Sequence, residues 1–182
     1  MAIATTDEIL DFWFSDEVTQ KWFEKDEDFD KEIKKRFLST YNDAKKKRAS
    51  MVGDSAEDML ARVLVLDQFP RNMFRGTKEA FVTDGFALRV ATDAIKKKYD
   101  RKLTDDQKKF LFMPFMHSED LKDQRTAVAL FSRVKDKDSL EFAVRHKEVI
   151  LRFNRFPHRN DAMNRASSEQ EEKFLAKTPV GY

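Results

Sequence analysis

The sequence predicts an all-α fold, and three observations support this prediction. Glycine and proline together account for only 8 of the 182 residues, whereas a sheet protein with many tight turns needs more of both. Apolar residues recur at helical spacing in several segments, as expected for helices that bury one face. Helix-start signals precede most of these segments, so composition, periodicity and capping favour the same class.

The helix starts can be placed from capping residues. In four places a side-chain oxygen stands three positions before a Glu or Gln, which is the spacing of a capping box; the pairs are Thr5 with Glu8, Asp54 with Glu57, Thr104 with Gln107, and Ser168 with Glu171. Thr77 and Ser118 indicate further caps. The expected helices cover residues 6–14, 27–48, 55–67, 77–98, 105–113, 118–134, 138–154 and 168–176. Short connections favour antiparallel neighbours, so we expect one domain over residues 1–182 with seven to nine helices.

Composition excludes several classes of protein. With 41% hydrophobic and 37% charged residues, the chain is neither disordered nor embedded in a membrane. A net charge of +2 argues against a dedicated nucleic-acid binder. The absence of cysteine excludes disulfides, thiolate nucleophiles and Cys-zinc sites. The N-terminal residues lack the basic region of a signal peptide, and the longest uncharged apolar run, Phe110–Met116, is too short to span a bilayer. We therefore expect a cytoplasmic protein.

The first unusual stretch surrounds Asp67. Residues 60–66 are apolar on nearly all sides, as in a buried helix, and Asp67 follows at the expected helix C-terminus, where the helix dipole disfavours a carboxylate. Arg71 or Arg75 is the natural partner that would offset this cost. The Asp67–Arg pair is either a latch that holds the turn or part of a binding site.

The second stretch is the apolar segment 110–116 and the residues after it. We expect one helix to end before Pro114 and another to begin near Ser118, with His117 at the junction. Gln124 shares a helical stripe with Leu121 and other apolar residues, so its amide faces inward and needs hydrogen-bond partners.

The third stretch runs from Arg145 to Arg165. His146 lies on the apolar face of its helix, where most histidines are hydrogen-bonded core residues. The stretch contains six Lys or Arg against two acidic residues, a local charge of +4. Its Arg155–Asn160 segment, RFPHRN, echoes residues 68–72, QFPRN. In both places Phe-Pro is expected to end a helix, although ending a helix requires neither the Arg nor the Asn.

These blocks resemble a known family. LDQFPRNMFRG at 66–76, FLFMPFMHSEDL at 110–121 and RFNRFPHRN at 152–160, with ILDFWF at 9–14, are similar to the signature blocks of the domain of unknown function 924 family. The resemblance runs along essentially the whole chain. It implies an all-α fold related to tetratricopeptide-like superhelices and no established activity.

The departures from the family pattern are mild. Asn154 and Asn164 stand where the family pattern has Gly, and Asn is the next-best residue for a left-handed backbone position. Ser168 replaces a Thr at a helix cap. No polar signature residue is lost, so the resemblance implies an intact site.

Known catalytic and cofactor motifs are absent from the sequence. There is no Gly-x-Ser-x-Gly elbow, no Gly-x-Gly-x-x-Gly and no P-loop. The three histidines match no recognised metal motif, so we expect no metal and no cofactor.

The remaining polar residues favour recognition of an anion. Arg, Asn and His side chains are the donors that hold carboxylates or phosphates. We expect a pocket for an anionic small molecule or an acidic peptide, lined by Asp67, Arg71, Asn72, Arg75, His117, Gln124, His146, Arg155, His158, Arg159 and Asn160. Three alternatives stay open: an acid–base enzyme, such as a small hydrolase, that uses His117 or His146; RNA binding through residues 152–159; and a polar network that only stabilises the fold. The sequence indicates neither the ligand nor the oligomeric state.

Overall fold

The computed structural model describes residues 2–47 and 54–178, and within these ranges it contains helices and no β-strand. The prediction of an all-α fold is confirmed. The helices are α1 (Thr6–Trp13), α2 (Asp16–Thr19), α3 (Glu27–Lys47), α4 (Ala56–Val63), a π-helical turn η1 (Leu64–Gln68), α5 (Phe69–Met73), η2 (Lys78–Phe81), α6 (Asp84–Lys96), η3 (Tyr99–Lys102), α7 (Asp105–Met116), α8 (Leu121–Phe131), α9 (Lys137–Phe153), η4 (Pro157–Arg159) and α10 (Glu169–Leu175). The elements η2, η3 and η4 are 3₁₀-helices. Residue 48, the expected end of the helix over 27–48, lies outside the described residues.

The chain divides into two compact units. Unit 1 consists of Met1–Arg75 and Glu79–Leu103, and unit 2 consists of Gly76–Lys78 and Thr104–Tyr182. No helix of the described residues is long and apolar enough to cross a membrane. The likeness to tetratricopeptide superhelices concerns the arrangement of the whole chain and stays a prediction.

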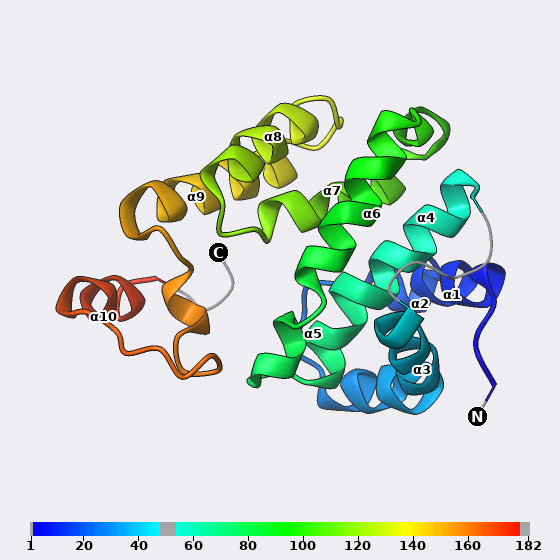
Figure 1. The fold of residues 1–182 in the computed structure, drawn as a ribbon, viewed down its shortest axis with the longest axis horizontal. Helices are drawn as coiled ribbons and strands as arrows, with labels where there is room; N and C mark the ends of the chain where they lie inside the picture. Colours follow the sequence, from blue (N-terminus) through cyan, green and yellow to red (C-terminus); the bar gives the residue numbers. More distant parts are fainter. Residues whose placement is uncertain (1, 48–53, 179–182) are drawn as a thin grey trace. The chain divides into compact units, whose positions relative to one another are not determined.

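Unit 1 is built on an aromatic core. α3 packs against α5, and α4 packs against α6 (Figure 1). The ring of Phe69 lies 4.7 Å from that of Phe37 and 5.6 Å from that of Trp13, measured between centroids. All three side chains are fully buried, and burial of each stabilises the fold by roughly 2–3 kcal/mol.

Unit 2 has α7, α8 and α9 as its centre, with α8 and α9 side by side (Figure 1). The rings of Phe112 and Phe131 meet edge to face between α7 and α8. Phe174 of α10 packs on Phe153 of α9, so the C-terminal helix covers the end of α9.

The predicted caps are confirmed at three of four helices. Complete capping boxes form at Thr5, Thr104 and Ser168. The box before α4 begins one residue later than expected, at Ser55 with Asp58, because Ser55 rather than Asp54 accepts the first-turn N–H. The expected helix over 77–98 is two elements, η2 and α6. The cap of α8 is Asp120, so the cap predicted at Ser118 is wrong.

Pro114 does not end its helix, so the prediction that a helix ends before Pro114 is wrong. α7 continues through Pro114 to Met116. An internal proline costs about 3 kcal/mol because it removes one backbone hydrogen bond. Every residue of Phe110–Met116 is buried, and burial of its three Phe side chains outweighs that cost at roughly 2–3 kcal/mol each.

The two predicted left-handed asparagines are confirmed. Asn154 has a φ of 56° and ends α9, and Asn164 has a φ of 52° in the following loop. The short polar side chain of Asn tolerates this conformation better than other L-residues.

Candidate functional site

Asp67 lies inside a continuous helical segment, so its predicted place at a helix C-terminus is wrong. α4, the π-turn η1 and α5 follow one another without a break from Ala56 to Met73. The backbone N–H of Phe69 donates to the carbonyl of Leu64, five residues earlier. Pro70 has no N–H for the carbonyl of Leu66, four residues before it, and that carbonyl accepts the Thr83 hydroxyl at 2.6 Å instead. The helix therefore passes through Pro70.

The carboxylate of Asp67 is fully buried and held by two neighbours. Its Oδ2 accepts a hydrogen bond from Gln68 Nε2 at 2.6 Å, and its Oδ1 lies 3.3 Å from the guanidinium of Arg71. The predicted Asp67–Arg71 pair is confirmed. Arg71 also donates two hydrogen bonds of 2.9 Å to Asp84. Burial acts to lower the pKa of Arg71, but the charges of Asp67 and Asp84 outweigh this effect and raise it. Asp84 is a member of this network that the sequence analysis missed.

Asn72 and Arg75 both bind Asp30 of α3. The Asn72 amide donates to Asp30 Oδ1 at 2.8 Å, and Arg75 donates to both carboxylate oxygens at 2.7 Å. Asp30 raises the pKa of Arg75 through this hydrogen bond. The sequence analysis missed Asp30, because it precedes Arg75 by 45 residues and no spacing rule connects them.

Three predicted site residues of unit 2, His146, His158 and Arg159, gather around the ring of Phe156. We call these four residues the Phe156 cluster. The His146 ring meets Phe156 edge to face at 5.4 Å between centroids, and the His158 ring lies 5.6 Å away. The guanidinium carbon of Arg159 lies 4.6 Å from the centre of the Phe156 ring. Arg159 is 5% exposed and His146 is 7% exposed. The prediction that His146 faces the core is confirmed.

The hydrogen bond of His146 determines which ring nitrogen carries a proton. Nδ1 lies 2.8 Å from the carbonyl oxygen of Phe142. Because a carbonyl only accepts, Nδ1 carries the proton, and in the neutral ring Nε2 is the atom able to accept one.

Arg155 binds a carboxylate of α10. It donates to both carboxylate oxygens of Glu171 at 2.6 and 2.7 Å and to the carbonyl of Ala166. The Arg155 hydrogen bond lowers the pKa of Glu171 to about 2. Asn160 donates to Ser167 at 3.0 Å. These contacts hold the loop between α9 and α10.

Glu119 is a second carboxylate that the sequence analysis missed. It accepts two hydrogen bonds from Arg165, at 2.8 and 3.0 Å, and one from the backbone N–H of Phe156. Burial raises its pKa, but Arg165, the Phe156 N–H and the charge of Arg159 outweigh burial and lower it. Glu119 and Glu171 lie outside the stretch that carries a charge of +4, and they offset part of it.

His117 and Gln124 lie where α7 ends and α8 begins. His117 is the C-cap of α7, and its N–H donates to the Met113 carbonyl. The fully buried Gln124 donates to the carbonyls of Met116 and Ser118, both at 2.7 Å. The inward orientation predicted for Gln124 is confirmed, and its amide ties α8 to the end of α7.

The predicted site residues belong to both units. Unit 1 contains Asp67, Arg71, Asn72 and Arg75, which contact α3 and α6 through Asp30 and Asp84. Unit 2 contains the other seven, of which His146, His158 and Arg159 gather on Phe156. Within the described ranges, no group of three or more His, Asp or Glu side chains is placed to hold a metal ion.

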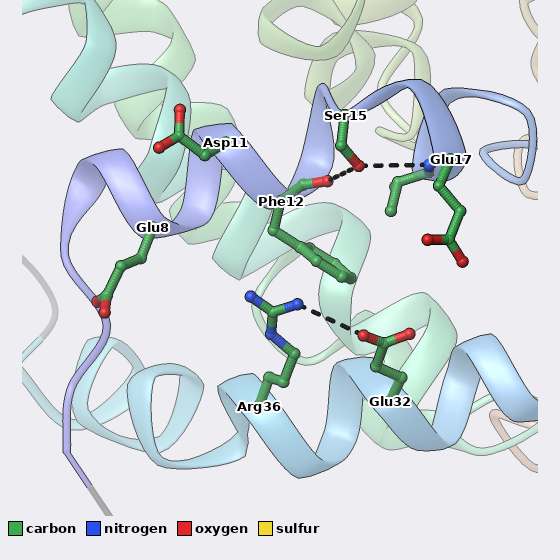
Figure 2. A pocket seen from close by; sticks show the side chains of 8 residues that line it. Glu8, Asp11, Phe12, Ser15, Glu17, Glu32 and Arg36 are labelled. Carbon is green, nitrogen blue, oxygen red and sulfur yellow. Dashed lines mark hydrogen bonds and ion pairs between the residues drawn. The ribbon is translucent and has the colours of Figure 1, made fainter.

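A hollow on unit 1 was not predicted. It has a volume of about 380 Å³ and lies between α1, α2 and α3, as Figure 2 shows. Its lining residues are Glu8, Asp11, Phe12, Ser15, Glu17, Val18, Glu32 and Arg36. The Arg36 guanidinium lies 4.3 Å from the centre of the Phe12 ring and 3.4 Å from Glu32. Four carboxylates and one guanidinium make the hollow acidic, and its residues are too dispersed in sequence to form a motif.

The comparisons with known proteins cover nearly the whole chain. A family described as bacterial proteins of unknown function, DUF924, matches residues 9–179. A solved structure of a protein of unknown function from Agrobacterium tumefaciens is 35% identical, with a TM-score of 0.89 over 95% of this chain and 97% of that chain. No curated protein matches the chain at a significant level. The chain therefore belongs to the DUF924 family of bacterial proteins of unknown function.

Proposed function

We propose that the protein binds an anionic small molecule or an acidic peptide, and that the Phe156 cluster supplies the contacts. The observation that carries the proposal is the gathering of Arg159, His146 and His158 on the single ring of Phe156. We also infer that it acts in the cytoplasm, since it contains no cysteine and no described helix that could span a membrane.

The charges around the cluster support an anion rather than a cation. Arg155 and Arg165 each make two hydrogen bonds to a carboxylate, with Glu171 and Glu119 respectively. Arg159 is a third guanidinium, and its charge acts on Glu119. Three guanidiniums against two carboxylates give the group a net positive charge before either His is protonated. A guanidinium on an aromatic face presents its edge donors in a planar fork, which fits a carboxylate or phosphate.

The other predicted arginines do not support the proposal equally. Arg71 and Arg75 bind Asp67, Asp84 and Asp30, so their donors hold carboxylates of unit 1. Arg155 likewise holds Glu171, so Arg159 on the Phe156 ring of unit 2 is the predicted arginine on which the proposal depends.

A thermal-shift screen against phosphorylated and dicarboxylate metabolites tests the proposal. A ligand at 100 times its Kd stabilises the folded state by about 2.7 kcal/mol, which is readily measured. His158→Ala and Arg159→Gln should weaken binding by at least tenfold, whereas Arg152→Gln, an exposed charge on α9, should leave it unchanged. Folded variants that bind as tightly as the parent would contradict the proposal. Turnover of a bound compound that is lost in His146→Ala would instead favour the acid–base enzyme.

The acidic hollow favours a second candidate function, binding of a cationic ligand such as a polyamine or a Lys- or Arg-rich peptide. Asp11 of α1 is one of the residues that line the hollow, and it makes no hydrogen bond or ion pair with any described residue. Arg36 on Phe12 illustrates how a guanidinium packs there.

Calorimetric titration with spermidine separates the two candidates. Asp11→Asn with Glu32→Gln should weaken spermidine binding at least fivefold, and Glu27→Gln with Asp28→Asn, the same charge change at the start of α3, should not. Equal loss in both double variants would indicate a general charge effect and contradict a site in the hollow.

A further inference from the structure

The segment from Lys96 to Lys102, at the end of α6 and in η3, is a strongly basic exposed segment that is not used above. Five of its seven residues are Lys or Arg. Its single acidic residue, Asp100, is 3% exposed. All five cations are exposed, so the segment presents positive charge to solvent while its carboxylate faces the protein.

Among the described residues, two of these cations have carboxylate partners and three have none. Lys96 lies 3.7 Å from Asp93, and Lys97 lies 2.6 Å from Asp54. Lys98, Arg101 and Lys102 have no Asp or Glu oxygen within 4 Å among residues 2–47 and 54–178. We call these three residues and Tyr99 the η3 patch.

The first two residues of the η3 patch are held by hydrogen bonds. Lys98 has a φ of 61°, and its N–H donates to the Ile95 carbonyl. This left-handed residue ends α6 and turns the chain into η3. The Tyr99 hydroxyl donates to the backbone carbonyl of Asp54 at 2.5 Å. The cations therefore extend from an ordered turn.

An aromatic ring lies among these charges. The ammonium groups of Lys102 and Lys97 lie 5.3 and 5.8 Å from the centre of the half-buried Tyr99 ring. Cations beside an aromatic ring are the combination with which proteins hold single-stranded nucleic acid, since the ring stacks on a base and the cations neutralise phosphates.

We propose that the η3 patch binds the phosphodiester backbone of single-stranded nucleic acid, with Tyr99 as its stacking residue. The patch contains no exposed large apolar side chain, which disfavours insertion into a membrane surface. The aromatic ring distinguishes it from a surface that only attracts acidic proteins. The whole-chain charge of +2 obscures this local feature, and the patch belongs to unit 1, whereas the Phe156 cluster belongs to unit 2.

The earlier RNA hypothesis for residues 152–159 is less well supported by contacts. Arg155 holds Glu171, and Arg159 is buried on Phe156. Nucleic-acid binding is therefore better tested at the η3 patch.

Fluorescence anisotropy with a labelled 12-mer of uridylate tests the proposal over a range of salt concentrations. The triple variant Lys98→Gln, Arg101→Gln, Lys102→Gln removes three phosphate contacts. The slope of log K against log salt should then decrease in magnitude by about 2, since each contact to a single strand contributes about 0.7. The control Lys31→Gln, Lys34→Gln, Lys35→Gln on α3 changes the net charge equally and should leave the slope unchanged.

Tyr99 variants test the stacking role separately. Tyr99→Leu should weaken binding about tenfold, and Tyr99→Phe, which keeps the ring and loses the hydroxyl, should bind within twofold of the parent. Circular dichroism confirms that each variant is folded. Arg159→Gln, which tests the Phe156 cluster, should not change binding of the oligonucleotide, so the two proposals fail independently.

Four results would overturn the proposal: no binding by the parent at 50 mM salt, equal loss in both triple variants, tighter binding of a duplex of the same length, or tighter binding of phosphatidylserine vesicles than of the oligonucleotide.

Discussion

The two Phe-Pro corners have nearly the same sequence and adopt different structures. At Phe69-Pro70 the helix continues through a π-turn, because Thr83 satisfies the carbonyl that Pro70 leaves without an N–H. At Phe156-Pro157 the helix has already ended at the left-handed Asn154, and Pro157 begins a 3₁₀-turn, where its missing N–H is not needed. The structural effect of a proline therefore depends on what replaces its hydrogen bond.

The arginine that follows each proline also differs in its partners. Arg71 lies between the carboxylates of Asp67 and Asp84. Arg159 lies on the face of Phe156. The first corner places a guanidinium between two carboxylates, and the second places one beside two imidazoles. This difference is why the proposed anion site lies at the second corner.

The largest expected effect on stability is at Arg71, the arginine of the first corner. Arg71→Met leaves two carboxylates without their shared cation, and the free energy of unfolding should fall by about 3–5 kcal/mol. Urea denaturation followed by circular dichroism measures the change. Adding Asp67→Asn and Asp84→Asn to Arg71→Met should restore part of the loss. A fall of less than 1 kcal/mol for Arg71→Met would show that the network is not structural.

Thr83 is expected to have the next largest effect. Thr83→Val keeps the shape of the side chain but leaves the buried Leu66 carbonyl without its donor, at a cost of about 1–3 kcal/mol. Thr83→Ser retains the hydroxyl and should lose less than half as much in the same denaturation experiment. If Thr83→Val and Thr83→Ser lower the unfolding free energy equally, the hydroxyl does not support the π-turn.

A smaller effect is expected from acid titration of Glu171 at the second corner. The Arg155 hydrogen bond lowers the pKa of folded Glu171 from 4.5 to about 2. Glu171 therefore binds its proton more readily in the unfolded chain, and its stabilising contribution is complete above pH 4.5 and disappears as the pH falls toward 2. Glu171→Gln should flatten the decline of unfolding free energy between pH 4.5 and 2. An unchanged pH profile would contradict this assignment.

The smallest effect is expected at Asn154. Asn154→Ala places a Cβ-bearing residue without a helpful polar group at positive φ, which should reduce the unfolding free energy by about 1 kcal/mol. Asn154→Gly should be neutral or slightly stabilising. Thermal unfolding compares the two variants, and a loss with Gly equal to that with Ala would assign the effect to the asparagine side chain rather than to the backbone.

Local features of the sequence were sufficient to predict the fold class and three capping boxes, whereas the left-handed Asn154 and Asn164 followed from the resemblance to the family, whose pattern has Gly there. The inward faces of His146 and Gln124 also followed from helical periodicity. Each of these features depends on residues within a few positions along the chain, where backbone geometry alone determines which groups meet. The partner of Asp67 was predicted as Arg71 or Arg75, and Arg71 is the one found, although the helix C-terminus on which that prediction rested is not at Asp67.

Only the tertiary structure decided what the remaining polar residues do. Arg75 meets Asp30 across 45 positions, and Arg165 meets Glu119 across 46. Thr83 reaches Leu66 across 17 and allows the helix to continue through Pro70. Counted along the sequence, residues 145–165 carry a charge of +4. Packing brings the carboxylates of Glu119 and Glu171 to this segment from other parts of the chain, because buried charges must be paired. Which carboxylate each arginine holds is therefore a property of packing.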